Sequence, residues 1–138
     1  MRPSISVWLL TPLAILALAA TGATSVSFTP SQMTKGEKQF AQSCAQCHGA
    51  HLEGGVGPAL TGPTFDTLSK KVGANVGDIF TYMTTNMPMN EPASLSHGQY
   101  VSIMAFILSK NGYKPARKPL TFAAAENSKA PIIKKKSR

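Results

Sequence analysis

Residues 44–48 read Cys-Ala-Gln-Cys-His, and this short stretch decides how the rest of the chain is interpreted. We expect it at the end of a helix that begins in Thr34-Lys35-Gly36-Glu37, which has the form of a capping box, and runs to about Ala45. Two thiols three residues apart can reach the two vinyl-derived carbons on one edge of a porphyrin, and the next residue can place its imidazole under the iron. CxxCH is the attachment sequence of a c-type haem. The motif predicts one haem c bonded to Cys44 and Cys47, with His48 as an iron ligand.

Three other interpretations compete for the same residues. A thioredoxin-like redox pair would need a neighbouring βαβ pattern, which the sequence lacks. Zinc could be held by Cys44, Cys47 and His48 with either His51 or His97, but no second cysteine pair stands at finger spacing. A plain surface disulfide is possible in an exported protein. The full CxxCH spacing favours the haem interpretation over all three.

A second axial ligand is expected from a methionine, because a thioether is soft and stabilises ferrous iron. Met87 lies in Asn86-Met87-Pro88, where the proline would stiffen the segment that carries the sulfur, and Met89 is the competitor in the same loop. Methionines at helical positions usually fill the core. His51 is too close in sequence to His48 to be the second ligand, and His97 is expected in an exposed first helical turn. These weaker candidates are Met33, Met83, Met104, His51 and His97.

Caps and apolar spacing predict two further helices. Asn75, followed by Asp78, opens one that extends to Thr85. Ser96 opens the other, and the pair Asn111-Gly112 ends it. Glycines and prolines between Gly49 and Pro63 exclude regular structure there. No strand pairing is indicated, so we predict an all-α fold. The last helix has an apolar stripe of helical period, made of Tyr100, Ile103, Met104, Ile107 and Leu108.

The N-terminal segment is predicted to be a signal peptide over residues 1–23, with cleavage between 19 and 25. Arg2 gives it a positive start, residues 7–20 are almost wholly apolar, and small residues follow. An uncleaved membrane anchor is the alternative, but a bilayer needs about 20 apolar residues. We therefore expect export to the periplasm.

Charge is uneven along the 138 residues, whose formal net charge is +8. Residues 30–113, the predicted folded domain, carry five cations and five acids, whereas residues 114–138 carry eight cations and Glu126 alone. Because the latter segment also holds three prolines and little periodicity, we predict a disordered basic tail. It either serves solubility or attracts an acidic redox partner or an anionic membrane. Nucleic acid is not expected as the partner of an exported protein.

Residues 32–113 resemble the class I cytochromes c, and are similar to small bacterial periplasmic cytochromes c and to the haem domains of quinoprotein dehydrogenases. The first helix leads into Cys44-Ala45-Gln46-Cys47-His48-Gly49, as in that family. Three later segments carry the rest of the resemblance: Gly55-Val56-Gly57-Pro58-Ala59-Leu60, Met87-Pro88-Met89-Asn90-Glu91-Pro92, and Leu95-Ser96 with Ala105-Phe106-Ile107-Leu108.

The resemblance implies a small cytochrome c fold and roles for particular residues. The carbonyl of Pro58 would accept a hydrogen bond from the His48 ring, Leu60 would pack on the haem, and Met87 would be the second iron ligand. A glycine on the first helix, Gly36, would let it cross the last helix closely, with Phe40 meeting Phe106.

With both axial positions filled, one-electron exchange is the chemistry that remains, so we expect an electron carrier and not an enzyme, and we expect it to be a monomer. It would pass electrons between a dehydrogenase or quinol-oxidising complex and a terminal oxidase or reductase. The alternatives are a tightly bound cytochrome subunit of a dehydrogenase complex, and a haem enzyme or sensor with an open sixth position.

Overall fold

The computed structural model describes residues 26–134, and in this part of the chain the regular structure is entirely helical. Asn75 and Pro131 form an isolated antiparallel bridge. The prediction of an all-α fold is thus confirmed. The helices are α1 (Pro30–Ser43), α2 (Ala45–His48), α3 (Gly62–Val72), α4 (Val76–Asn86), α5 (His97–Lys110) and α6 (Phe122–Glu126).

Capping boxes set where the main helices begin. Asn75 accepts from the backbone of Asp78 at the start of α4, and Ser96 caps α5. Both starts agree with the sequence prediction. The predicted start of the first helix at Thr34 is wrong, because Thr29 forms a capping box with Gln32 and α1 begins at Pro30. A proline at the first position suits a helix start, since its missing N–H would have no partner there.

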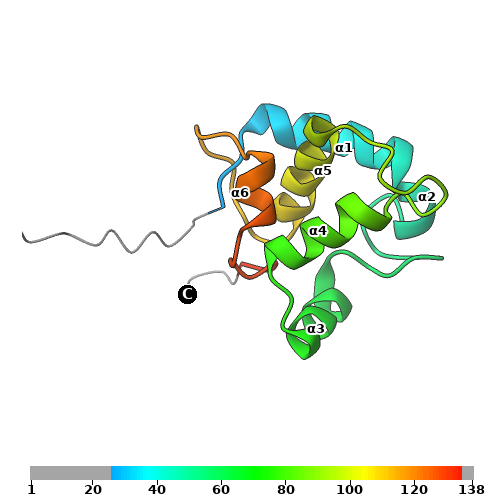
Figure 1. The fold of residues 1–138 in the computed structure, drawn as a ribbon. Helices are drawn as coiled ribbons and strands as arrows, with labels where there is room; N and C mark the ends of the chain where they lie inside the picture. Colours follow the sequence, from blue (N-terminus) through cyan, green and yellow to red (C-terminus); the bar gives the residue numbers. More distant parts are fainter. Residues whose placement is uncertain (1–25, 135–138) are drawn as a thin grey trace, which may run out of the picture.

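The core forms where α1 crosses α5 (Figure 1). Gly36 makes this close crossing possible, because an added Cβ would lie 1.8 Å from the carbonyl oxygen of Ser102. One turn further on, the rings of Phe40 and Phe106 lie 5.4 Å apart. Most of α5 is buried. This crossing holds α2, which directly follows α1, in a fixed place relative to α5.

Helix α3 was not predicted from the sequence. It begins at Gly62, inside the stretch of glycines and prolines that was expected to lack regular structure up to Pro63. Phe65 and Ser69 are buried, whereas Leu68 and Val72 are 46% and 66% exposed. The helix therefore presents an apolar face that the described residues leave uncovered.

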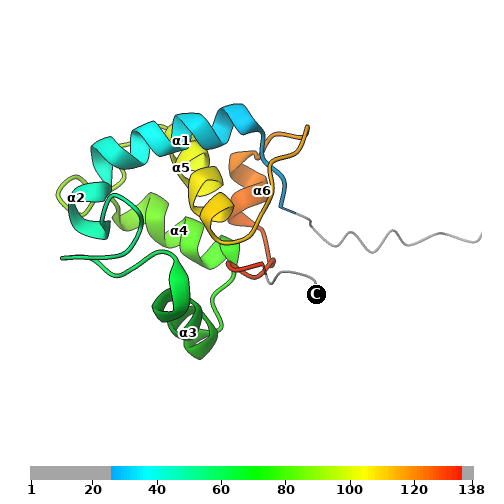
Figure 2. The ribbon, with the colours of Figure 1, turned by 180° about the vertical axis from the view of Figure 1, so that it is seen from behind.

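The prediction of a disordered tail is wrong for residues 114–134, which we call the C-terminal strap. Leu120, Ala125 and Ile132 of the strap are at most 4% exposed and belong to the core. Figure 2 shows the strap and α6 against α4 and α5. The apolar residues of the strap are irregularly spaced, so their burial follows from contacts with distant segments and not from a periodic pattern.

Hydrogen bonds tie the strap to the segment before α1, to the end of α5 and to the start of α4. The backbone N–H of Ala116 donates to the carbonyl of Phe28 at 2.7 Å, and Tyr113 donates its hydroxyl to Pro131 at 2.6 Å. Val76 and Gly77, at the start of α4, donate their backbone N–H groups to strap carbonyls at 2.9 Å each. The strap therefore satisfies amides that the first turn of a helix otherwise leaves free.

The predicted signal peptide, residues 1–23, and the last four residues lie outside the described part of the chain. Within residues 26–134, none of the helices has the length and apolar character needed to cross a bilayer.

Candidate functional site

The two cysteines lie at the junction of α1 and α2. Cys44 follows the last residue of α1 and is half-buried, whereas Cys47 lies within α2 and is exposed. Both thiols are free. Burial, with a smaller contribution from the neighbouring Cys47, raises the pKa of the Cys44 thiol to about 11. Because neither cysteine is in a disulfide, both thiols are available to form thioether bonds.

His48 ends α2 with its ring buried and oriented. Its Nδ1 lies 2.8 Å from the carbonyl oxygen of Pro58, and because a carbonyl can only accept, Nδ1 carries the proton. The Nε2 atom is then left with its lone pair, which is the form that binds a metal. An added Cβ at Gly57 would lie 2.9 Å from Cε1 of His48. The absence of a side chain at Gly57 is therefore required for this ring position.

The loop from Gly49 to Thr61 is folded back on α2 by backbone hydrogen bonds. Gly57 donates to the carbonyl of Cys47 and Gly54 to that of His48, both at 2.8 Å. The carboxylate of Glu53 accepts from the backbone of His51 at 2.7 Å, and backbone N–H donors lower the pKa of Glu53. These bonds place Pro58 beside the His48 ring.

Leu60 is half-buried against the core, and Asn111 holds it there. The side-chain amide of Asn111 donates to the carbonyl of Leu60 at 2.9 Å and also to that of Ile107. Asn111 was predicted only as a helix stop. Its second role, linking the end of α5 to the loop, depends on a contact 51 residues away in sequence, which no local pattern reveals.

Met87 and Met89 differ sharply in their surroundings. Met87 follows the last residue of α4 and packs, half-buried, against the core, whereas Met89 is 72% exposed. The hydroxyl of Tyr100 donates to the carbonyl of Met87 at 2.6 Å. Tyr100 therefore fastens the methionine loop to α5. Sequence reasoning assigned Tyr100 only to the apolar stripe and missed this bond.

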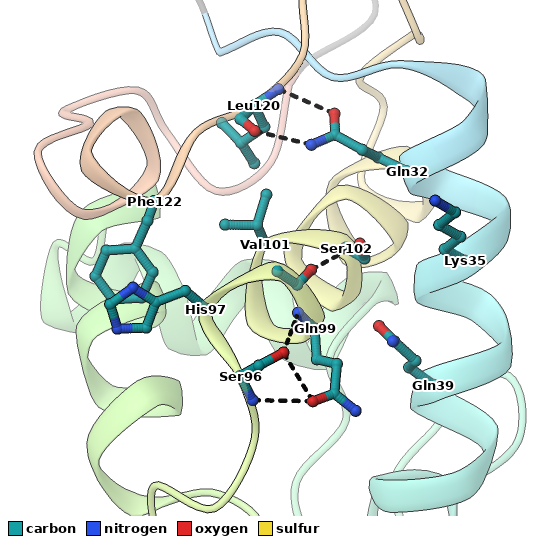
Figure 3. A pocket seen from close by; sticks show the side chains of 11 residues that line it. Gln32, Lys35, Gln39, Ser96, His97, Gln99, Val101, Ser102, Leu120 and Phe122 are labelled. Carbon is teal, nitrogen blue, oxygen red and sulfur yellow. Dashed lines mark hydrogen bonds between the residues drawn. The ribbon is translucent and has the colours of Figure 1, made fainter.

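The two histidines considered as weaker ligands are placed differently from His48. His51 is exposed in the loop beside Glu53. His97 stacks on Phe122 of α6 with ring centroids 3.9 Å apart, and it lines a cavity of about 510 Å³ between α1, the start of α5 and the strap (Figure 3). Gln32, on the opposite wall, donates to the carbonyl of Leu120 at 2.8 Å. His97 thus contributes to docking of the strap.

The site as a whole fits a covalently attached haem. It offers two free thiols, a buried imidazole whose Nδ1 is already bonded, and a thioether at the end of α4. Figures 1 and 2 both place the loop after α4 beside α2, at one end of the molecule. Among residues 26–134, no three side chains of the His, Cys, Asp and Glu types gather as a metal-binding group, so the described part offers no zinc cluster.

Comparison with known proteins gives a family and a fold. Residues 31–107 match the family described as cytochrome c oxidase, cbb3-type, subunit III. The chain is similar in structure to the sulfane dehydrogenase SoxCD from Paracoccus pantotrophus, with 23% identity and a TM-score of 0.52. The similarity covers 83% of this chain and 65% of that one, so the chain spans less than two thirds of the solved protein. No curated protein matches.

Proposed function

Since the chain belongs to the cytochrome c family described as subunit III of cbb3-type cytochrome c oxidase, and this family carries covalent haem c, we propose that it is an exported one-electron carrier with His48 and Met87 as its iron ligands. The observation that carries the proposal is the contrast between Met87, which packs against the core, and Met89, which is 72% exposed. When bound, the haem supplies a one-electron Fe(III)/Fe(II) couple. Two protein ligands leave no open position for a substrate.

In this proposal the residues around the ligands set their geometry. The carbonyl of Pro58 keeps the proton on Nδ1 of His48 and thereby directs Nε2 toward the metal. Tyr100 holds the backbone of Met87 at the end of α4. Leu60 contributes apolar surface, which excludes water and favours the less charged ferrous state. Cys44 and Cys47 keep the cofactor from dissociating.

The electron donor is proposed to be a dehydrogenase or a quinol-oxidising complex, and the acceptor a terminal oxidase or reductase. Support comes from the family, which is described as a subunit of a cytochrome c oxidase, from the similarity in fold to a sulfane dehydrogenase, and from the apolar segment at residues 7–20, which is typical of an export signal. The periplasm is the compartment we propose. The mass of the purified protein gives its N-terminus, and a chain that retains residue 1 would contradict cleavage.

Substitution of each methionine tests the ligand assignment. Met87→Ala should abolish the weak far-red absorption band of the oxidised protein, which the resemblance associates with iron–methionine ligation. It should also lower the reduction potential by a sizeable part of the roughly 0.8 V range that axial ligands span. The matched variant Met89→Ala should leave both unchanged, because this side chain is exposed. If Met89→Ala lost the band and Met87→Ala retained it, Met89 and not Met87 would be the iron ligand.

A further inference from the structure

The C-terminal strap carries a group of cations that form no ion pair with any described residue. Within residues 26–134 the structure has one ion pair, between Lys70 and Asp66, and it lies outside the strap. The five strap cations are all exposed, and Glu126 is the strap's acidic residue. The remainder of the described chain carries as many acids as cations. We call the strap cations the basic end: Lys114, Arg117, Lys118, Lys129 and Lys134.

These cations sit on a fixed surface and not on a flexible arm. Burial of Leu120, Ala125 and Ile132 anchors the strap along its length. Its backbone is bonded to the segment before α1, to the start of α4 and, through Lys134, to Asn111 at 2.9 Å. A fixed set of like charges can orient a molecule on a charged surface, which a mobile arm cannot do as well.

Most of the basic end lies away from the haem-attachment end: Arg117 and Lys118 lie beside the segment before α1, and Lys129 lies beside the start of α4. Lys134 is the exception, because its backbone is bonded to Asn111, which also contacts Leu60. Figures 1 and 2, related by half a turn, both show α6 and the segment before α1 at one extreme and α2 with the methionine loop at the other, while the last part of the strap lies by the start of α4. Residues 44–61 and 87–95, at the haem-attachment end, contain Glu53 and Glu91 but no lysine or arginine. Backbone donors lower the pKa of Glu53 and so keep its carboxylate ionised. The molecule therefore has a positive end and an opposite end with negative character.

The basic end is poorly placed to dock a redox partner. Electron tunnelling weakens steeply with distance, so a partner bound at the strap would stand on the wrong side of the protein. A membrane fits better, because an anionic surface attracts several fixed cations together and needs no short path to the haem. Two of these cations, Arg117 and Lys118, lie beside the start of the described chain, where the hydroxyl of Ser27 donates to the carbonyl of Lys118 at 2.8 Å.

We propose that the basic end is a contact surface for anionic phospholipid headgroups, which holds the haem-attachment end away from the bilayer. Cations near an anionic bilayer are attracted to it, and Glu53 and Glu91 at the far end are repelled. Both effects favour the same orientation. The redox partner then reaches the haem-attachment end from the aqueous side. Binding to lipid does not depend on electron transfer. The functional value of the orientation rests on the proposed carrier function.

Vesicle binding by the purified haem-loaded protein tests the surface. Lys114→Gln, Arg117→Gln and Lys118→Gln together should weaken binding to vesicles of phosphatidylcholine mixed with phosphatidylglycerol by roughly 100-fold at low salt, at about fivefold per cation. The matched triple of Lys38→Gln, Lys70→Gln and Lys71→Gln removes the same charge from α1 and α3. It should weaken binding by less than about tenfold. Pure phosphatidylcholine vesicles control for insertion of any retained apolar segment.

Three outcomes would overturn the proposal. The protein could bind both vesicle types equally, or the two triples could weaken binding by the same factor, which would make net charge the cause. In the third outcome, the protein does not bind vesicles, and the triple substitution at Lys114, Arg117 and Lys118 slows electron exchange with an acidic soluble protein. This last result would assign the surface to a protein partner.

Orientation has its own readout. A nitroxide at Val56→Cys, a position 92% exposed in the loop after α2, should stay accessible to a water-soluble relaxation agent when the ferrous protein is bound to anionic vesicles. A nitroxide at Lys129→Cys should become protected. The reverse pattern would show the haem-attachment end against the lipid. Because neither readout involves electron transfer, failure of the proposed carrier function would leave both measurements interpretable.

Discussion

Tyr100 illustrates what sequence reasoning can reach at the scale of single residues. Its place in the apolar stripe predicted burial correctly, and it is 2% exposed. Its hydroxyl bond to the Met87 carbonyl could not be predicted, because it depends on how the methionine loop turns back onto α5. By contrast, the hydrogen bond between His48 and Pro58 was implied by the resemblance, and the structure has it. The motif and the resemblance therefore indicated the bond that orients His48. The bond that holds the backbone of Met87 depends on tertiary contacts and could not be predicted.

The Tyr100 hydroxyl should stabilise the methionine loop. Tyr100→Phe leaves the ring in place but removes the donor, so the carbonyl of Met87 loses its partner in a half-buried setting. We expect the free energy of unfolding to fall by about 1–2 kcal/mol. We also expect the far-red band of the oxidised protein to be lost at a lower denaturant concentration.

Tyr82→Phe is the matched control, because Tyr82 lies on α4 with 57% of its surface exposed. It should change neither quantity measurably. Equal effects of the two substitutions, by denaturant titration of the haem-loaded protein, would show that the Tyr100 hydroxyl does not position Met87.

At the scale of elements, local signals predicted some helices and missed others. The starts of α4 and α5 follow from caps that lie within three residues of one another, Asn75 with Asp78 and Ser96 with Gln99. Helix α3 was missed because its first residues are Gly62 and Pro63, which were grouped with the preceding loop. The strap was missed because its basic, proline-containing composition outweighed a few scattered apolar residues. Its order comes from long-range contacts.

Truncation of a buried strap residue should show that the strap is part of the folded unit. Ile132 is 1% exposed, so Ile132→Ala removes buried methyl groups and leaves a cavity. The free energy of unfolding should fall by about 3 kcal/mol, within the usual range for isoleucine-to-alanine changes.

The adjacent Ile133→Ala removes the same atoms from a half-buried position and should cost about 1 kcal/mol or less. Equilibrium denaturation, followed by helical circular dichroism, measures both. If Ile132→Ala were as mild as Ile133→Ala, the strap would contribute little to the stability of the domain.

At the scale of the whole molecule, composition and spacing predicted the all-α class, the neutral body and the charged C-terminal segment, but not how charge and site are arranged in space. The arrangement arises because the strap runs from the end of α5 to the segment before α1, forms α6 at the end remote from α2, and then passes to the start of α4 (Figure 1). The positive charge of the strap is therefore distributed unevenly over an otherwise neutral domain. Its haem-attachment end is free of lysine and arginine over residues 44–61 and 87–95.

The central claim, that protein atoms fill both axial positions of the iron, is tested most directly by adding carbon monoxide to the reduced haem-loaded protein. We predict that the absorption spectrum stays unchanged, because the Met87 thioether already holds the sixth position. Met87→Ala should bind the gas and serves as the positive control. Prompt formation of a carbon monoxide adduct by the unsubstituted protein would contradict this ligation and indicate an open haem site.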